Sequence, residues 1–464
     1  MSVPFNARVF REYDIRGKAE ADLGDAFVTA LGQAYGTFVR RRGGTRVALG
    51  RDCRVSGPRL FAAFSGGVRA AGVHVIDIGI VPTPVLYWSL FHLPVDGGTI
   101  ITGSHNPGDE NGFKLCVGRT SIYGADIQTL RTLIETGDLE QGAGGLESHD
   151  VLDAYLDDLA ARLVPARPLK VVVDAGNGMG GLTAGRLYRR LGHEVIELYC
   201  DLDGSFPNHH PDPTVEANLV DLVAAVAAHG ADLGIAFDGD ADRVGAVDAR
   251  GRVVWGDELL TLFASERART HPGEALRVVC EVKCSQVVNL VLEPLGVHVE
   301  TWKVGHSLIK ARMKETGALI AGEMSGHLFF GDEFYGFDDA VYGGARLLRL
   351  VAAGDTPLTG LLDALPPSVT TPEIRVACDD ASKFDVVARA AAHFRALWPV
   401  NEIDGMRVQF EQGWGLLRAS NTQPVLVLRF EASTGVALAE YRGRVEAWLR
   451  ANAPEVHLDA VVGH

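Results

Sequence analysis

Short apolar segments alternate with helical patterns along most of this 464-residue chain. A segment that is apolar at successive positions is typical of a strand buried on both faces, and helices are what cover such a sheet. Amphipathic patterns of helical period separate these segments, and one of them stops at Gly230, a residue suited to a helix end. The alternation therefore predicts an α/β fold. We expect strands at 46–49, 73–78, 99–101, 170–173, 195–199, 233–237, 277–282 and 318–321, and helices at 22–42, 151–163 and 216–229.

Composition excludes several classes of protein. The charge sum is 44 − 59 = −15, with a pI near 5.5, which argues against general binding to nucleic-acid phosphates but leaves a small anionic substrate open. No apolar run approaches the roughly 20 residues that span a bilayer, and the first residues carry charges where a signal peptide is apolar. The six scattered cysteines, with Cys280 and Cys284 in a C-x3-C spacing, match neither a redox pair nor a zinc knuckle. We expect a cytoplasmic protein.

Three stretches rich in glycine, proline or turn residues look like domain joints, at 138–148, 248–256 and 364–372. Each of the first three segments contains a Gly-containing apolar strand that runs into a polar loop: GGTIITGSHNP at 97–107, ADLGIAFDGDADR at 231–243 and TGALIAGEMSGH at 316–327. Ligands of α/β sheets collect beyond the carboxyl ends of the strands. Either these loops build one composite site, or they show only the strand-to-loop pattern that is common to α/β folds.

The acidic loop that follows the strand at 233–237 holds Asp238, Asp240 and Asp242. Carboxylates at every second position of an extended segment project to one side, so that three oxygens converge on one hard cation. Three carboxylates are few for Ca²⁺ and suit Mg²⁺, which also takes phosphate oxygens. A solvated acidic turn is the alternative, although mutual repulsion disfavours it. The loop predicts a magnesium site.

The hydroxyl loop at 102–107, TGSHNP, places Ser104 between Gly103 and His105, and Lys114 follows downstream. The G-x-S-x-G pattern of serine hydrolases is absent. A serine that shares a site with Mg²⁺ suits a phosphorylated side chain whose oxygen completes the metal's coordination. On this loop alone, a phosphoserine and a plain polar turn stay equally open.

Two further loops suit a sugar phosphate. Glu323 and Ser325 alternate in GEMSGH at 322–327, so both are able to face the hydroxyl groups of one ligand. An arginine and short donors in RASNTQP at 418–424 suit a phosphate that does not react. The donors there are Arg418, Ser420, Asn421 and Thr422. Arg16, Lys283 and His306 stand in turn-like contexts where surface charge is the commoner role, and Tyr13 alone favours packing.

Two other enzyme classes have local support. GNGMGG at 176–181 follows a strand and satisfies G-x-G-x-x-G, the dinucleotide-binding pattern. Asp174 would place a carboxylate near the pyrophosphate, however, and a dehydrogenase leaves the acidic and hydroxyl loops without a purpose. IAFDGDAD resembles the D-x-D of phosphatases that use an aspartate nucleophile, but Asp242 stands at the last position instead of Thr or Val. Both classes are disfavoured.

The four loops together are specific. TGSHNP, DGDADR, GEMSGH and RASNTQP, in this order over nearly the whole chain, resemble the signature loops of the α-D-phosphohexomutase superfamily. FREYDIRG and KVGHSLIK are typical of its bacterial phosphomannomutase/phosphoglucomutase branch.

The resemblance implies an α/β fold of four domains around one central cleft: 1–149 with the phosphoserine loop, 150–252 with the metal loop, 253–366 with the sugar-recognition loop, and 367–464 as a smaller α+β phosphate-binding domain that closes over the substrate. The first three share an α/β core with a mixed sheet. It also implies that Ser104 carries the phosphoryl group and, with Asp238, Asp240 and Asp242, holds Mg²⁺. Glu323 and Ser325 would recognise the sugar, and Arg418, Ser420, Asn421 and Thr422 would hold the substrate's phosphate. Tyr13, Arg16, Lys114, Arg243, Lys283, His306 and His327 would line the cleft.

The reaction that the resemblance implies is reversible phosphoryl transfer between the 1- and 6-positions of mannose and glucose phosphates, through a hexose 1,6-bisphosphate, with glucose 1,6-bisphosphate as activator. Ser104, Lys114, Arg243, His306 and Arg16 are the expected catalytic residues, and Lys114 or His306 is the candidate proton acceptor. We expect a monomer. A glucosamine-phosphate mutase is the nearest alternative, disfavoured by Met324 where that relative usually has Gln, and a non-catalytic sugar-phosphate sensor is the other.

Overall fold

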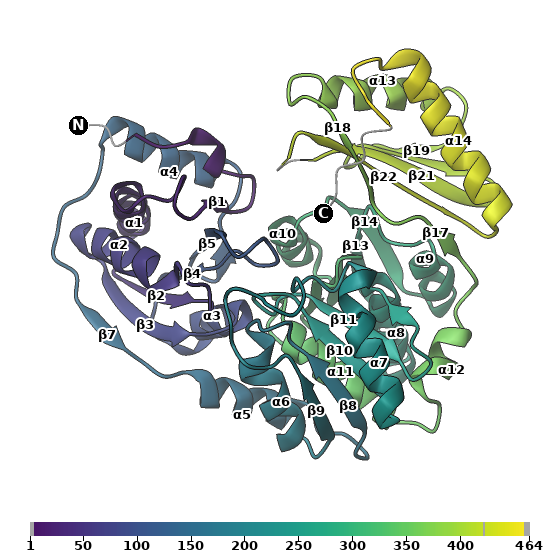
Figure 1. Ribbon diagram of the computed structural model, residues 1–464, viewed down its shortest axis with the longest axis horizontal. Helices are drawn as coiled ribbons and strands as arrows, with labels where there is room; N and C mark the ends of the chain where they lie inside the picture. Colours follow the sequence, from purple (N-terminus) through teal and green to yellow (C-terminus); the bar gives the residue numbers. More distant parts are fainter. Residues whose placement is uncertain (1–3, 421–422, 459–464) are drawn as a thin grey trace. The chain divides into compact units, whose positions relative to one another are not determined.

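A computed structural model describes residues 4–420 and 423–458 of the chain. The chain forms two compact units, Met1–Leu259 with Ser325–Leu362 and Leu260–Met324 with Asp363–His464. Figure 1 labels their helices and strands. Four sheets follow one another along the described residues, with helices between their strands in the sequence. The predicted α/β class is therefore confirmed.

The first sheet of unit 1 is mixed. β4 (Gly97–Ile101), β2 (Arg46–Arg51), β3 (His74–Ile80) and β7 (Leu146–Ser148) are parallel neighbours, whereas β5 (Glu110–Val117) runs antiparallel between β4 and β1 (Ile15–Lys18) and also pairs with β6 (Thr120–Ser121). α1 (Asp25–Arg40), α2 (Gly57–Ala70) and α4 (Ala125–Thr136) bury one core with this sheet. α3 (Thr83–His92) instead packs toward α5 (Leu152–Arg162), since the indole of Trp88 donates to Asp158 at 2.9 Å. Helices thus cover both faces, as the apolar strands require.

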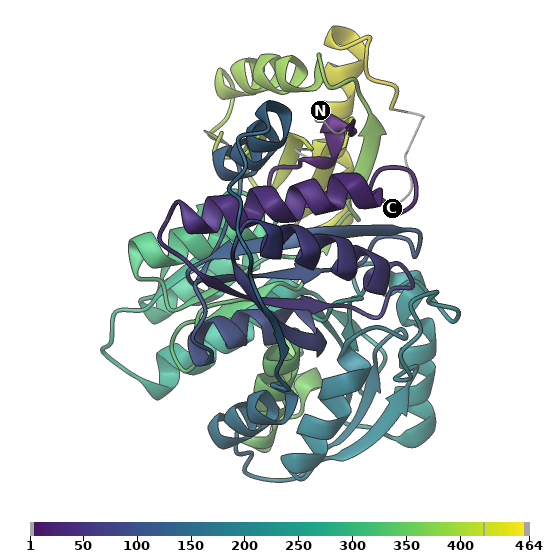
Figure 2. The same ribbon diagram turned by 90° about the vertical axis from the view of Figure 1, so that its left-hand side faces the viewer.

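Close backbone contact explains the glycines of α1 and α2, which lie side by side (Figure 2). A Cβ atom on Gly67 of α2 would lie 2.0 Å from the carbonyl oxygen of Thr29, and one on Gly32 of α1 would lie 2.1 Å from that of Phe64. Any side chain at either position would therefore push the helices apart.

The second sheet of unit 1 carries the acidic loop. β10 (Leu233–Phe237) lies parallel to β8 (Lys170–Asp174), which is parallel to β9 (Glu194–Leu198), and antiparallel to β11 (Val244–Asp248), which pairs with β12 (Val253–Val254). α6 (Gly180–Arg190) and α7 (Val220–His229) accompany it, and Gly230 ends α7 with φ +56°, as the sequence predicts. Unit 1 is completed by β16 (Leu328–Phe330), α11 (Ala340–Ala352) and α12 (Leu358–Asp363).

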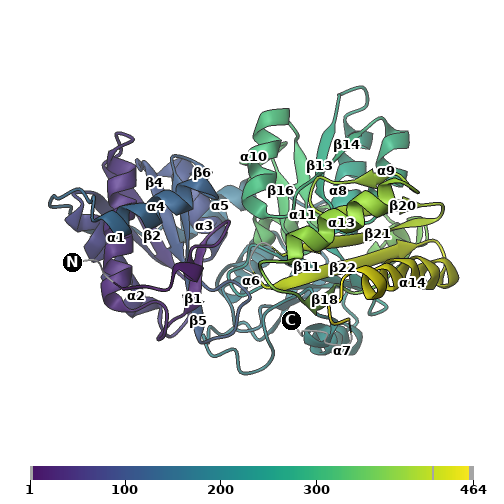
Figure 3. The same ribbon diagram turned by 90° about the horizontal axis from the view of Figure 1, so that it is seen from above.

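Unit 2 contains a parallel sheet and an antiparallel sheet. β14 (His298–Trp302), β13 (Arg277–Glu281) and β15 (Ile320–Gly322) are parallel. In the sequence, α8 (Gly256–Thr270) precedes β13, α9 (Val287–Leu292) connects β13 to β14, and α10 (His306–Thr316) connects β14 to β15. The last sheet is a smaller antiparallel one whose core includes α13 (Lys383–Arg395) and α14 (Gly435–Asn452), on the same face of the sheet (Figure 3). Its strands are β17 (Val369–Thr370), β18 (Ile374–Ala377), β19 (Val400–Asn401), β20 (Met406–Phe410), β21 (Gly413–Ala419) and β22 (Val425–Ala432).

The strands expected from the sequence all occur, with ends that shift by up to two residues. β5 was not among them, although it carries Lys114, because its polar residues obscure a strand pattern. All three expected joints also contain a short strand, β7, β12 and β17, and each pairs at the edge of its sheet. Among the described residues, no helix combines the length and apolar character needed to cross a bilayer.

Asp339 connects α11 to the rest of unit 1. Its carboxylate accepts the backbone N–H of Tyr342 at 2.9 Å, which caps α11, and the hydroxyl of Tyr155 in α5 at 2.9 Å. Burial raises the pKa of Asp339 from 3.8 to about 7, although both hydrogen bonds favour the charged form.

We predict that Asp339→Asn makes the protein relatively more stable as pH rises. Between about pH 4 and pH 7 the folded protein keeps a proton that the unfolded chain loses, so this carboxyl stabilises wild type at low pH and that contribution disappears as pH passes 7. Asn does not titrate and still offers an oxygen to Tyr342. The melting temperature of the variant minus that of wild type should increase from pH 5 to pH 8, by at least the equivalent of about 1 kcal/mol, since one pKa unit is worth about 1.4 kcal/mol. A difference that does not change with pH would contradict the buried titration.

Candidate active site

The acidic loop of unit 1 is a tight turn, not the extended segment assumed from its spacing. Ala241 has φ +61° and donates its N–H to the carbonyl oxygen of Asp238 at 3.1 Å, while Oδ1 of Asp238 accepts the N–H groups of Asp242 at 3.0 Å and Arg243 at 3.1 Å. The turn still gathers Asp238, Asp240 and Asp242, each fully buried, with ligand oxygens within 4.8 Å of one another. Convergence therefore comes from the folding of the loop back on itself.

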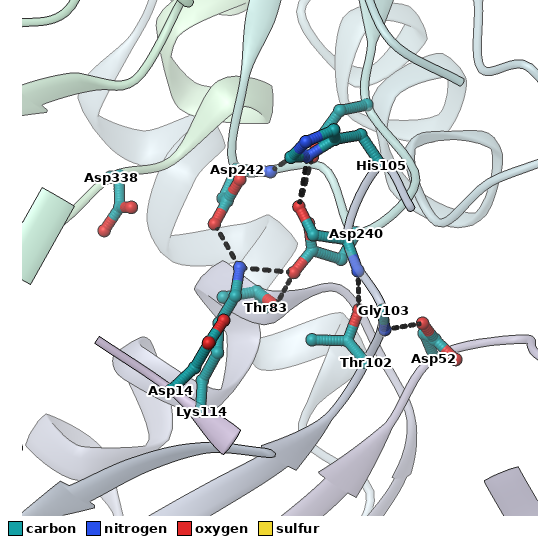
Figure 4. A network of polar contacts seen from close by, with 12 residues as sticks. Asp14, Asp52, Thr83, Thr102, Gly103, His105, Lys114, Asp240, Asp242 and Asp338 are labelled. Atoms are coloured by element: carbon teal, nitrogen blue, oxygen red, sulfur yellow. Dashed lines mark hydrogen bonds and ion pairs between the residues drawn. The ribbon is translucent and has the colours of Figure 1, made fainter. Parts of the chain in front are cut away.

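Lys114 lies between two of these carboxylates (Figure 4). Its Nζ donates to Asp240 Oδ2 at 2.6 Å and to Asp242 Oδ2 at 2.5 Å. Burial disfavours the ammonium, but attraction from Asp240, Asp242 and then Asp238 outweighs it and raises the pKa of Lys114. Burial and repulsion from Asp240 and Asp242 in turn raise the pKa of Asp238 well above its ordinary value. The cluster thus holds more negative charge than Lys114 alone compensates.

Ser104 follows β4 and lies against the acidic loop. Its Oγ donates to Asp238 Oδ2 at 2.9 Å and lies 3.2 Å from Nδ1 of His105. The backbone of Ser104 has φ +51°, and a Cβ on Gly239 would lie 2.3 Å from the Ser104 carbonyl oxygen, so the two loops touch through their main chains. Non-glycine residues in this conformation are strained, and such strain concentrates at functional sites.

Arg54 holds the hydroxyl loop in place, and no pattern in the sequence pointed to it. Its fully buried guanidinium donates to the carbonyl oxygens of Ser104 at 2.7 Å and Asn106 at 2.6 Å, and to those of Pro107 and Glu110. Asp52 pairs with Arg54 at 3.2 Å and accepts the N–H of Gly103 at 3.3 Å. One side chain therefore fixes four carbonyl groups around the serine.

Thr83 is a second residue that sequence reasoning missed. At the start of α3, its hydroxyl donates to Asp240 Oδ2 at 2.5 Å and its N–H donates to the carbonyl oxygen of Asp240 at 3.0 Å. A threonine at a helix start is too common to single out from sequence alone.

Three of the remaining predicted residues of unit 1, Arg16, Arg243 and His327, contact the hydroxyl loop or the acidic loop. Arg16 donates to Asn106 of the hydroxyl loop at 2.8 Å and to Asp14 at 2.7 Å. Arg243 donates through Nε to Nε2 of His327 at 2.9 Å, and Nδ1 of His327 lies 3.6 Å from Asp242. Ser325 is buried, and within the described residues its Oγ has no hydrogen-bond partner. Tyr13 is half-buried just ahead of β1.

Unit 2 holds a second charged cluster around Lys283. Glu281, at the end of β13, accepts the N–H of Lys283 at 3.0 Å and that of Met324 at 3.2 Å, so it ties together the loops that carry Lys283 and Glu323. The ammonium of Lys283 donates to Glu373 at 3.1 Å. Burial lowers the pKa of Lys283, but the negative charges of Glu281 and Glu373 raise it by more, so that the net shift is upward. Glu281 and Glu373 are also contributors that the sequence did not reveal.

Arg418 lies in the same electrostatic neighbourhood, since its charge acts on Lys283. Its Nη2 donates to Asp404 at 3.0 Å. Within the described residues, Oε1 of Glu323 is buried and has no hydrogen-bond partner, while His306 begins α10 and is 9% exposed. Ser420 follows β21, and the predicted Asn421 and Thr422 lie outside the described residues.

Comparison with known proteins gives one consistent result. Family models of phosphoglucomutase/phosphomannomutase match four successive parts of the chain: α/β/α domains I, II and III at residues 7–141, 153–251 and 255–369, and the C-terminal domain at 373–447. A phosphomannomutase/phosphoglucomutase of Pseudomonas aeruginosa is 46% identical over 431 residues, which cover 92% of either chain. A phosphoglucomutase of Neisseria gonorrhoeae is 42% identical over 96% of this chain and 97% of its own.

A solved structure agrees with these matches. The crystal structure of a phosphoglucomutase/phosphomannomutase family protein from Burkholderia thailandensis is 42% identical to this chain. It superimposes with a TM-score of 0.91 and covers 98% of this chain and 99% of its own. The likeness thus extends over sequence and fold.

We predict that Arg54→Lys lowers kcat by about 10- to 100-fold, because lysine keeps the charge but cannot donate to four carbonyl groups, and small misplacements of a reacting group carry costs of this size. Steady-state kinetics with glucose 1-phosphate measure the effect. Arg59→Lys is the matched control, since Arg59 donates to the carbonyl groups of Ala19 and Leu23, which lie outside the hydroxyl loop. Full activity of Arg54→Lys would show that the serine loop keeps its shape without the guanidinium.

Proposed function

The chain belongs to the phosphoglucomutase/phosphomannomutase family, and we propose that Ser104 is the residue that carries its phosphoryl group. The protein is a phosphohexomutase, an isomerase that moves phosphate between the 1- and 6-positions of a hexose. The hydrogen bond from Ser104 Oγ to Asp238 carries the assignment, because it joins an alcohol side chain to a buried acidic cluster. We assign glucose and mannose phosphates as substrates, as the names of the relatives support.

The acidic cluster fits a divalent cation. Oδ1 of Asp240 and Oδ1 of Asp242 are buried and, among the described residues, accept no hydrogen bond. Buried carboxylate oxygens without donors are costly, and Mg²⁺ prefers such ligands together with phosphate oxygens. We assign Mg²⁺ to Asp238, Asp240 and Asp242 with the phosphate on Ser104. When bound, Mg²⁺ would neutralise negative charge on the transferred group.

The protein's own residues position that group and compensate its charge. We propose that phosphorylated Ser104 donates its phosphoryl group to the free 6-hydroxyl of a hexose 1-phosphate, which gives a hexose 1,6-bisphosphate. This intermediate then reorients end for end in the site and returns the phosphoryl group of its 1-position to Ser104. Lys114 and Arg243 supply positive charge beside the serine, and such charge is what phosphoryl transfer requires. Lys114 donates to two carboxylates, so His306 is the better candidate to accept the proton of the attacking hydroxyl.

The remaining roles concern the substrate. The buried carboxylate of Glu323 and hydroxyl of Ser325 are suited to sugar hydroxyls, since both have unused hydrogen-bonding atoms among the described residues. Arg418 offers a guanidinium for the phosphate that does not react. We assign substrate contacts to Tyr13, Arg16, Lys283, His306, Glu323, Ser325, His327, Arg418, Ser420, Asn421 and Thr422.

We further propose glucose 1,6-bisphosphate as activator, a division into domains at 1–149, 150–252, 253–366 and 367–464, and a monomer in the cytoplasm. A bisphosphate of this kind would phosphorylate Ser104 again in enzyme molecules that have lost the phosphate from it. The cysteines support a reducing compartment, because all six are free thiols and Cys116, Cys280, Cys284 and Cys378 are buried.

We predict a phosphorylated serine. Purified enzyme incubated with glucose 1,6-bisphosphate should gain about 80 Da, the mass of one phosphoryl group, and Ser104→Ala should gain nothing and lose turnover. Intact-mass spectrometry measures the gain. Ser56→Ala is the control, because Ser56 lies at the start of α2 and its hydroxyl oxygen accepts a hydrogen bond from Asn111. An unmodified wild-type mass with full turnover would leave Ser104 without its role.

We also predict that removal of divalent metal abolishes turnover. Excess EDTA should reduce kcat at least about 100-fold, since the buried carboxylates and the phosphate would repel one another without the cation. Dialysis followed by Mg²⁺ should restore activity, which separates chelation from unfolding. Undiminished turnover in excess EDTA would refute the assignment of Asp238, Asp240 and Asp242.

A further inference from the structure

The carboxylate of Glu281 bridges two loops of unit 2 through hydrogen bonds to their main chains. Oε2 accepts the N–H of Lys283 at 3.0 Å, and Oε1 accepts the N–H of Met324 at 3.2 Å. The two loops follow β13 and β15, which are parallel neighbours with Cys280 opposite Gly322. Glu281 is fully buried, so water does not compete for either hydrogen bond.

A carboxylate suits this position and an amide does not. Both oxygens of a carboxylate accept hydrogen bonds, whereas the side chain of glutamine has one oxygen and one NH₂ group that only donates. Burial raises the pKa of Glu281, but the ammonium of Lys283 and the two main-chain N–H groups all favour the charged form. Because neither N–H group is free to rotate, an amide at Glu281 would force one of the two loops to move.

The loop that carries Lys283 has further supports. Nη1 of Arg429, a buried side chain of β22, donates to the carbonyl oxygen of Lys283 at 2.6 Å. Nη1 of Arg407 in β20 donates to the carbonyl oxygen of Val282 at 2.7 Å. The main chain on either side of Lys283 is thus held by arginines as well as by Glu281. An amide at Glu281 would therefore displace the other loop, at Met324.

Glu323, directly before Met324, is the side chain that such a displacement would move. It is 3% exposed, and within the described residues its Oε1 is buried without a hydrogen-bond partner. A buried carboxylate oxygen without a donor is costly, and the hydroxyl group of a bound sugar would supply that donor. The value of this acceptor depends on where the main chain at Met324 places it.

We propose that Glu281 is a positioning residue, which sets the distance between the two loops and so places the carboxylate of Glu323 for a sugar hydroxyl. The inference rests on the proposed contact of Glu323 with substrate. It assigns Glu281 no contact with the sugar phosphate.

A counter-charge for Lys283 is the competing interpretation of Glu281. Nζ of Lys283 lies 3.9 Å from Oε1 of Glu281, but it donates to Oε2 of Glu373 at 3.1 Å. Glu373 is therefore the closer counter-charge, and the hydrogen bonds of Glu281 go to the main chain. The geometry thus favours the positioning role.

A double-mutant cycle tests the proposal. Glu281→Gln should raise KM for glucose 1-phosphate at least about 10-fold with kcat changed less than about 3-fold, because it weakens a contact made in bound substrate and in the transition state alike. Glu323→Ala removes that contact, so adding Glu281→Gln to it should cost less than about 3-fold in kcat/KM. An equal cost in both backgrounds overturns the proposal, and it is the result expected of a counter-charge or of a general loss of structure.

Glu300→Gln is the matched control for the change of carboxylate to amide. Glu300 lies on β14, the strand on the other side of β13, and accepts a hydrogen bond from Arg312 at 2.9 Å. Its kcat/KM should stay within about 2-fold of wild type, since neither substrate loop depends on it.

Hydrogen exchange in the wild type keeps the outcome decisive even if Glu281→Gln does not fold. Selective ¹⁵N-methionine labelling gives at most five amide signals, because the chain has five methionines, and Met324→Leu assigns the signal of Met324. Its amide should exchange at least about 100-fold more slowly than an unstructured amide, and Glu281→Gln should speed that exchange at least about 10-fold. Exchange at the unstructured rate in the wild type would overturn the proposal.

Failure of the proposed function gives a different result. Full kcat/KM in Glu323→Ala would contradict the contact of Glu323 with substrate, and the proposal would fall with it. Impaired kcat/KM in Glu323→Ala, together with a Glu281→Gln cost that is the same in both backgrounds, would overturn the positioning role alone.

Discussion

Three aspartate carboxylates buried in one turn are the constraint on which the rest of unit 1 depends. Carboxylates crowded together away from water repel one another and lose hydration, so each needs donors or positive charge. The chain supplies these from distant segments: Lys114 of β5, Thr83 of α3 and Ser104 after β4 all donate to the cluster. The site therefore exists only when these elements have assembled.

The first sheet delivers two of these groups through its register. β4 and β5 are antiparallel, with Ile100 opposite Lys114, so the strand that ends at the hydroxyl loop lies beside the strand that carries the lysine. The acidic loop arrives from β10 of the second sheet, and its Gly239 permits main-chain contact with Ser104. Elements of ordinary α/β topology thus bring the Ser104 hydroxyl, the Lys114 ammonium and the three aspartate carboxylates of the acidic loop together.

The sequence predicts the parts of this arrangement that repeat a local pattern. The strand at 233–237 and the end of α7 at Gly230 follow from apolar runs and from a left-handed glycine. The polar loops are visible because short hydrogen-bonding residues cluster there. Their roles are expected from the order of four motifs, and the family models and the 46% identical relative show the family to which that order points.

The rest depends on contacts between residues far apart in the chain. Arg54, Thr83 and Glu281 each act through hydrogen bonds to residues far along the chain, and a single polar residue leaves no periodic signal. The turn at Ala241 was missed for a different reason: alanine seldom adopts a positive φ, so the alternating acids look like an extended segment. Such strain is stabilised only by the surrounding structure.

A single-turnover label transfer tests the central claim most directly. Enzyme that carries ³²P on Ser104 is mixed with a stoichiometric amount of unlabelled glucose 1-phosphate and quenched at successive times. The account predicts that the label leaves the protein, passes through hexose bisphosphate and appears at the 6-position of the product, while the serine becomes unlabelled phosphoserine. Isomerisation of the sugar with the label still on the protein would contradict it.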